Sequence, residues 1–231
     1  MSRIIDLSVT VEDRMPAHKG LHKPFLIEHL SHQRSATMGF GTKEDPLTFA
    51  VAFFAMNDHI GTHVDAFYHV NPKGLTVDRM DISMFMGKAV CLDFRHIPDL
   101  GDIDVGDMEA AEKKSGVKID GHIVLLCTGL HRKYYPTDEV SLKNAGVTAA
   151  ATHWLADHNS KLHGVEGPST DKPSNDLFPN HRVCRDRGIT HYEWLCNLEE
   201  LIGKGEFHFE GVPIRLGGAT GSPVRAFARL D

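Results

Sequence analysis

Three histidines and one aspartate lie within eleven positions of the segment NDHIGTHVDAFYHV, residues 57–70. Imidazole nitrogens and a carboxylate together suit a divalent ion such as Zn²⁺, Mn²⁺ or Fe²⁺, whereas Ca²⁺ and Mg²⁺ prefer oxygen ligands. The set leaves a coordination position for water or for further ligands, which is typical of catalytic rather than structural metal sites. The alternative is a chance cluster, because the chain holds sixteen histidines. The candidate ligands are His59, His63, Asp65 and His69.

The backbone around these residues is expected to be extended. A helix would place His59 and His63 on one face, four residues apart. However, Gly61 and Thr62 are poor helix formers, and a strongly strand-like run precedes them. In an extended segment the side chains of His63 and Asp65 project to the same side. A turn at Gly61 would then bring His59 round to join them.

Short apolar runs bounded by polar turns predict β-strands along much of the chain. The run at residues 47–56 is continuous enough to predict a strand that is buried on both faces. The other strands are expected at residues 3–11, 24–31, 87–94, 121–129, 162–167, 207–216 and 222–230.

Helical patterns lie between these strands. Residues 104–116 begin at an Asp, carry Lys in the last turn and end at a Gly, which predicts a capped helix. Further helices are expected at residues 148–161, 179–188 and 191–205, with Gly188 separating the last two. Helices that alternate with strands predict one α/β domain over residues 1–231, with a mixed sheet and flanking helices. Residues 217–223, GGATGSP, predict a turn and lack the lysine and spacing of a phosphate loop.

The composition narrows the function classes. The 231 residues are 41% hydrophobic and carry a formal net charge of −6, which gives no support to nucleic-acid or membrane-surface binding. No apolar run is long enough for a transmembrane helix. The four cysteines are too far apart for a zinc finger or a disulfide scaffold, so we expect reduced thiols in a cytoplasmic protein.

Several segments together resemble one family. HIGTHVDAFYH, residues 59–69, is similar to the signature of the cyclase family, which contains the metal-dependent amidohydrolases bacterial kynurenine formamidase and isatin hydrolase. IDLSVTVEDRMPAHKG resembles the opening strand and loop of that family, and HGVEGPSTD resembles its G-[IV]-[DE]-x-P-S-x-D segment. Residues 178–201 resemble its C-terminal ligand region, and GSPVRAFA its last strand. The resemblance implies the swivelling β/β/α fold of the family.

The resemblance also implies roles for individual residues. The first two histidines and the aspartate of the signature bind metal in formamidases of this family, which here are His59, His63 and Asp65, and the carboxylate can bridge two ions. A second ion would take His181 and Glu193, which have the twelve-residue spacing of the family. The neighbouring His191 is the alternative ligand, and the flanking NLEEL favours Glu193.

The remaining assignments concern the reaction and the substrate. His69, the last histidine of the signature, is expected to transfer the proton. His18 falls where kynurenine formamidases carry a tryptophan that contacts the substrate. Ser169 is expected to donate or accept a hydrogen bond in the wall of the site. Phe67, which replaces a frequent proline of the family, is expected either to line the pocket or to pack in the core.

The resulting hypothesis is a metal-dependent hydrolase that holds one or two Zn²⁺ or Mn²⁺ ions per chain. Metal-bound hydroxide would cleave an aryl formamide such as N-formylkynurenine, a cyclic amide such as isatin, or a lactone. One alternative is a lyase or cyclase that abstracts a proton next to a carbonyl, and another is a protein that binds metal or ligand without turnover. The partner is a small molecule, and the resemblance implies a homodimer or homotetramer.

Overall fold

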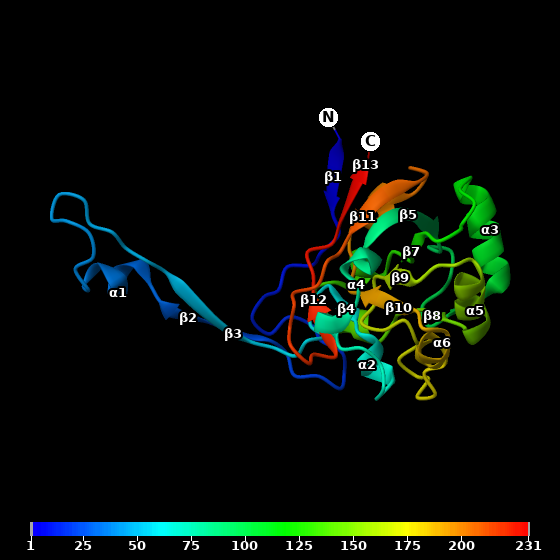
Figure 1. Cartoon of the computed structure of the whole chain (residues 1–231), viewed down its shortest axis with the longest axis horizontal. Coiled ribbons are helices and arrows are strands. Elements are labelled where there is room, and N and C mark those ends of the chain that lie inside the picture. Colours follow the sequence, from blue (N-terminus) through cyan, green and yellow to red (C-terminus); the bar gives the residue numbers. More distant parts are fainter. Residues whose placement is uncertain (1, 231) are drawn as a thin grey trace.

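A nine-stranded mixed sheet forms the body of the protein (Figure 1). The computed structural model describes residues 2–230. The strand order is β1-β13-β11-β5-β7-β9-β10-β4-β12, which confirms the predicted mixed α/β fold. The strands are β1 (Arg3–Asp6), β4 (His63–Asp65), β5 (Met86–Asp93), β7 (Ile123–Cys127), β9 (Leu162–Val165), β10 (Thr190–Glu193), β11 (Phe207–Glu210), β12 (Gly221–Pro223) and β13 (Phe227–Leu230).

The centre of the sheet is parallel and buried on both faces. Strands β5, β7, β9 and β10 pair in parallel, and β4 joins β10 in the antiparallel direction. Alternate residues of β7 enter different cores, because successive side chains of a strand point to opposite faces. Leu125 belongs to one hydrophobic cluster, whereas Val124 and Leu126 belong to the other. This buried parallel core holds the ends of the strands in fixed positions. The candidate site lies at these ends.

The longer helices pack beside this sheet, and their ends follow the local sequence. Helix α3 (Val105–Ser115) begins with a capping box formed by Asp104 and Asp107 and ends at Gly116, which is left-handed. Helix α5 (Ala149–Asp157) begins at Thr148, whose side chain accepts a hydrogen bond from the Ala151 amide. Helix α6 (Pro179–Arg187) ends at Gly188, whose backbone is left-handed. Within residues 2–230, no helix combines the length and the apolar character that crossing a bilayer requires.

Short elements complete the body. The short elements are α2 (Phe67–Val70), α4 (Leu130–Tyr134), α6 (Pro179–Arg187), β6 (Asp102–Ile103), β8 (Gly146–Val147) and the 3-10 turns η1 (Val77–Arg79), η2 (Ile82–Phe85), η3 (Asp138–Ser141) and η4 (Leu198–Leu201). Strands β6 and β8 pair in parallel and form a separate two-stranded sheet.

The helix predicted at residues 191–205 is wrong. Its first residues form the end of strand β10, and a 3-10 turn follows at Leu198–Leu201. Tyr192 and Trp194 are fully buried, because β10 lies inside the sheet between β9 and β4. Burial on both sides of the segment removes the polar face that a surface helix would need.

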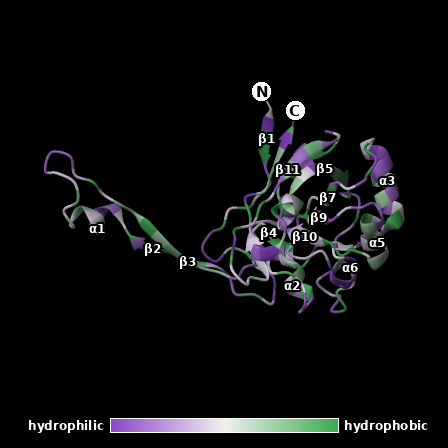
Figure 2. Ribbon diagram, viewed as in Figure 1, coloured by the Kyte–Doolittle hydropathy of each residue, from purple (hydrophilic) through white to green (hydrophobic). Residues whose placement is uncertain are grey.

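A long arm projects from the body (Figure 1). It contains β2 (Phe25–Leu30), the short helix α1 (His32–Ala36) and β3 (Val51–Ala55). Within residues 2–230, β2 pairs only with β3. The prediction that residues 47–56 form a buried strand is wrong in its burial, because every residue of β3 is exposed. Hydrophobic residues along the arm appear in green in Figure 2, and Phe53 and Phe54 are 52% and 60% exposed. The apolar run is therefore left uncovered by the rest of its own chain.

Candidate functional site

The histidine-rich segment follows a sharp turn into strand β4. Gly61 has a φ of +66°, and a Cβ at this position would lie 2.9 Å from a methyl group of Val11. Only glycine therefore fits the turn without strain. His63 and Asp65 follow in the extended strand, on the same side, which confirms the predicted local geometry.

One oxygen of Asp65 faces two histidines of its own segment. Its Oδ1 lies 2.8 Å from His59 Nδ1 and 3.4 Å from His63 Nε2. The Nδ1–H of His63 donates to the Gly61 carbonyl at 2.8 Å, so its Nε2 is the free lone pair. This tautomer is the one that a metal ligand needs.

The other oxygen of Asp65 faces histidines from three elements. Its Oδ2 lies 3.2 Å from His191 Nε2 and 3.8 Å from the Nε2 atoms of both His69 and His181. Burial opposes ionisation of Asp65, but the imidazoles of His69, His191 and His59 outweigh burial and hold its pKa well below its usual range. Asp65 is thus an ionised carboxylate at the centre of five imidazoles.

The two ligands expected from the C-terminal half lie beside this carboxylate. Glu193 places Oε2 at 3.5 Å from His63 Nε2 and Oε1 at 3.2 Å from His191 Nε2. His181, on α6, donates its Nδ1–H to Asp171 at 2.6 Å, which leaves its Nε2 directed at Asp65. The Asp171 carboxylate also accepts the His181 backbone amide, so one carboxylate fixes both the backbone and the ring of His181.

His59 is held by a second carboxylate. Its Nε2 lies 2.8 Å from the hydroxyl of Thr220, which donates to Asp58 at 2.8 Å. Because that hydroxyl gives its proton to Asp58, the His59 Nε2–H must donate to it, and Nδ1 faces Asp65. Burial lowers the pKa of His59, but Asp65 and Asp58 outweigh burial and raise it.

The donor set fits a divalent metal. Three buried atoms of the cluster have no hydrogen-bond partner among the described residues: His63 Nε2, Asp65 Oδ1 and His191 Nε2. Unsatisfied buried polar atoms are costly, and a cation would satisfy His63 Nε2 and Asp65 Oδ1. Two groups of ligand atoms share Asp65, each with its atoms within 4.8 Å of one another. His63 belongs to neither group, but its Nε2 lies 3.4 Å from Asp65 Oδ1 and 3.5 Å from Glu193 Oε2. One group is His59, Asp65 and His69, and the other is Asp65, His181, His191 and Glu193.

A cavity of about 200 Å³ opens beside the cluster. Of the three residues expected to contact substrate, His18 and Ser169 line this cavity. Phe67 does not line it and instead packs against the main hydrophobic core, the second of the two positions considered for it. The lining residues are His18, Leu21, His59, Asp65, His69, Pro168, Ser169, Phe178, His181 and Glu193.

The structure adds two residues to the site, His191 and Asp171, for which the sequence alone predicts no role. His191 contacts both Asp65 and Glu193, although it was considered only as an alternative to Glu193. The signal was the alternation Thr-His-Tyr-Glu, which places His191 and Glu193 on one face of a strand. Asp171 lies in the family-like segment HGVEGPSTD, but only the fold shows that it orients His181.

Known proteins resemble this chain over most of its length. A sequence profile of the family described as "Putative cyclase" matches residues 5–172. Kynurenine formamidase of Paracidovorax citrulli is 29% identical over 226 residues, which cover 97% of this chain and 95% of that protein. Kynurenine formamidase of Salinibacter ruber is 27% identical over 187 residues, which cover 80% of this chain and 82% of that protein.

Solved structures share the fold. Isatin hydrolase A from Ralstonia solanacearum gives a TM-score of 0.82 at 23% identity, covering 100% of this chain and 92% of that chain. An isatin hydrolase bound to the product analogue thioisatinate gives 0.83 at 20% identity, covering 99% and 92%. At this identity the likeness describes the fold, and the chemistry has to be argued from the residues of this chain.

Proposed function

The chain belongs to the cyclase family and is a hydrolase, and we propose that it cleaves a carbon–nitrogen amide bond with the help of one or two divalent ions. The observation that carries this proposal is the ionised, buried Asp65 among five imidazoles beside an open cavity. The names of the curated relatives, which are formamidases, support the same reaction class.

His59, His63 and Asp65 would hold one ion, and Asp65, His181 and Glu193 would hold a second. A divalent ion bound here supplies Lewis acidity, which lowers the pKa of coordinated water and polarises a substrate carbonyl. Zn²⁺ and Mn²⁺ both suit imidazole and carboxylate ligands, so the donor set is compatible with either. All five side chains are buried, which keeps competing bulk water away from the ligand atoms.

His69 is the residue placed to move a proton. Its side chain is 35% exposed, unlike the nearly buried His63, and it lines the cavity with Nε2 towards Asp65. Burial lowers the pKa of His69, and the neighbouring His59 and His181 lower it further against the opposing effect of Asp65. A neutral imidazole at pH 7 can accept a proton as the substrate is attacked and return it to the leaving nitrogen.

The walls of the cavity favour a small aromatic amide. Leu21, Pro168 and Phe178 supply apolar surface, and Phe178 lies edge-on to the ring of His181. His18 and Ser169 supply polar groups that can bind a carbonyl, carboxylate or amine of the substrate. An aryl formamide such as N-formylkynurenine and a cyclic amide such as isatin both have this combination of ring and amide.

The deciding experiment is proton release near neutral pH by protein loaded with Mn²⁺ or Zn²⁺. N-formylkynurenine and isatin would be tested side by side with wild type, His69→Asn and the control His96→Ala, whose side chain is 63% exposed outside the cavity. We expect acid release on one substrate, its loss in His69→Asn with metal retained, and wild-type behaviour of the control. Turnover without acid release would instead indicate a lyase. Unchanged activity of His69→Asn would contradict the role of His69.

The exposed arm supports a homodimer as the working form. A two-stranded hairpin is marginally stable by itself, and β2 and β3 pair with no other strand among the described residues. Phe25, Phe53 and Phe54 of this arm are at least 45% exposed. A second copy of the chain would cover this surface, as large exposed apolar patches usually require.

A cytoplasmic location remains a prediction from the sequence. The four cysteines are unpaired in the structure.

A further inference from the structure

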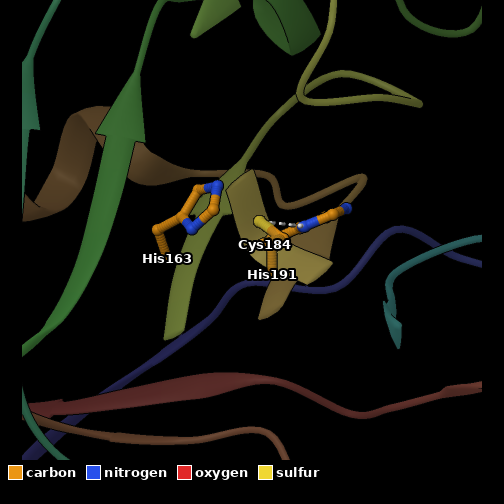
Figure 3. Close-up of side chains that lie close together, drawn as sticks. All are labelled: His163, Cys184 and His191. Atoms are coloured by element: carbon orange, nitrogen blue, oxygen red, sulfur yellow. Dashed lines mark hydrogen bonds between the residues drawn. The ribbon is translucent and has the colours of Figure 1, made fainter. Parts of the chain in front are cut away.

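A second group of ligand-type side chains, drawn in Figure 3, also includes His191. His191 directs Nε2 at Asp65 and Glu193, while its Nδ1 lies 3.8 Å from the sulfur of Cys184. His163 completes the group from the neighbouring strand β9. These three side chains are His163, Cys184 and His191, which are 1%, 2% and 2% exposed.

The fold fixes the separation of these donors. His163 and His191 are direct partners in the parallel pairing of β9 with β10, so their rings lie side by side with centroids 5.3 Å apart. Cys184 is contributed by α6, which packs over this pair. One ligand atom from each of the three residues lies within 4.8 Å of the others.

These separations suit one small ion. Zinc–sulfur bonds are about 2.3 Å and zinc–nitrogen bonds about 2.0–2.1 Å, so ligands of one ion lie roughly 3.6–3.8 Å apart at tetrahedral to trigonal angles. The observed distance of 3.8 Å between Cys184 Sγ and His191 Nδ1 matches this range.

The other polar neighbour of the group is neutral. Asn180 lies with Nδ2 at 3.3 Å from His163 Nε2 and with Oδ1 at 3.4 Å from the sulfur of Cys184. Burial lowers the pKa of His163 well below its usual value, which leaves a neutral imidazole available as a ligand. Burial raises the pKa of the Cys184 thiol, so uptake of an ion must displace the thiol proton to solvent.

We propose that His163, Cys184 and His191 form an inner site for a thiophilic ion, Zn²⁺ or Cu⁺, distinct from the centre at Asp65. One thiolate and two imidazoles with no carboxylate favour these ions over Mn²⁺, Mg²⁺ or Ca²⁺. With Nδ1 of His191 bound to the inner ion, its proton sits on Nε2 and donates to Asp65 or Glu193. The inner ion would thereby fix the orientation of two carboxylates of the outer centre, without contact with the substrate.

The test uses the absorption of cobalt, which replaces zinc as a probe. A thiolate bound to Co²⁺ gives a charge-transfer band, whereas the outer centre has only nitrogen and oxygen donors. We expect the band in wild type and also in His63→Ala, which disables the outer centre. It should vanish in Cys184→Ala and persist in the matched control Cys127→Ala, whose buried cysteine lies beside Glu166 and Glu199. The inference therefore does not depend on turnover.

Two further measurements complete the test. His163→Gln should weaken cobalt binding at the thiolate by at least about tenfold, which keeps the proposal testable if Cys184→Ala fails to fold. Cu⁺ titrated anaerobically against a chromogenic chelator decides between copper and zinc as the preferred ion. Cobalt bound to wild type without a thiolate band overturns the inner site, as does a band that depends on Cys127 instead of Cys184.

Discussion

Replacing Glu166 with glutamine should stabilise the folded chain at neutral and alkaline pH. Glu166 follows β9 and is fully buried. Its Oε2 accepts the backbone amides of Thr128 and Gly129 at 2.6 Å, whereas its Oε1 has no partner among the described residues. The Oε1 of Glu199 is also buried without a partner, and the two carboxyl groups lie in one cluster with Cys127. Protonation of Glu166 would remove the repulsion between these two carboxylates.

The magnitude follows from the pKa of Glu166. Burial raises this pKa to about 7, with a further contribution from Glu199 that opposes the hydrogen bonds from Thr128. An ordinary glutamic acid has a value near 4.5, and each pKa unit corresponds to about 1.36 kcal/mol. The difference therefore amounts to roughly 3 kcal/mol of unfolding free energy.

The sign of the effect on stability depends on whether the folded or the unfolded chain binds the Glu166 proton more tightly. The folded chain binds this proton more strongly than the unfolded chain, so stability from this group is present at acid pH. That contribution is lost as the pH rises through about 7. Glutamine mimics the protonated acid, since it carries no charge and its oxygen can accept the Thr128 and Gly129 amides.

Urea unfolding of the metal-free chain between pH 5 and 8.5 measures the difference between Glu166→Gln and wild type. The difference should be small at pH 5 and grow to about 2–3 kcal/mol in favour of the variant by pH 8. Glu109→Gln, an exposed change on α3, serves as the control and should show no such trend. A variant that is less stable than wild type across the whole range would refute the reasoning, because it would mean that Glu166 is ionised in the folded chain.

Two other perturbations probe the site and the arm. Asp171→Asn removes the carboxylate that fixes His181, so metal affinity measured by chelator competition should fall about 10–100-fold; the exposed Asp176→Asn should leave it unchanged. Replacing Phe53 and Phe54 together with glutamate should separate the homodimer and so halve the molar mass measured by light scattering. Leu177→Glu, at an exposed residue of the body, should leave the molar mass unchanged. A wild-type chain that is monomeric at the same concentration would contradict the homodimer.

The sequence predicted elements well where local chemistry determines the ends. Helix α3 was expected at residues 104–116 and lies at Val105–Ser115, because Asp104 and Gly116 form its two caps. Strands β5 and β7 were expected at residues 87–94 and 121–129, and their apolar runs lie at the centre of the sheet. In these segments the local preference and the tertiary environment agree.

Burial was harder to predict than strand formation. Residues 47–56 have the continuous apolar pattern of a central strand, and β3 does form there. A run of apolar residues predicts that a strand is buried, but it does not predict whether the same chain or a second copy buries it. In the arm, β3 pairs with β2 and with no other strand in the described part of the chain, so the pattern is consistent with an interface between copies.

The same limit concerns His191, which was considered only as the alternative to Glu193. Read with a helical period, residues 191–205 place His191 and Glu193 on different faces, so only one of them could serve the site. With the two-residue period of β10, both face Asp65, while Tyr192 enters the core on the opposite side. The twelve-residue spacing from His181 and the flanking NLEEL favour Glu193, but they do not show that His191 lies beside it. The Nδ1 of His191 connects the outer centre to Cys184. A histidine whose two nitrogens face two separate donor groups fixes its ring in one orientation, so its replacement should disturb both groups together.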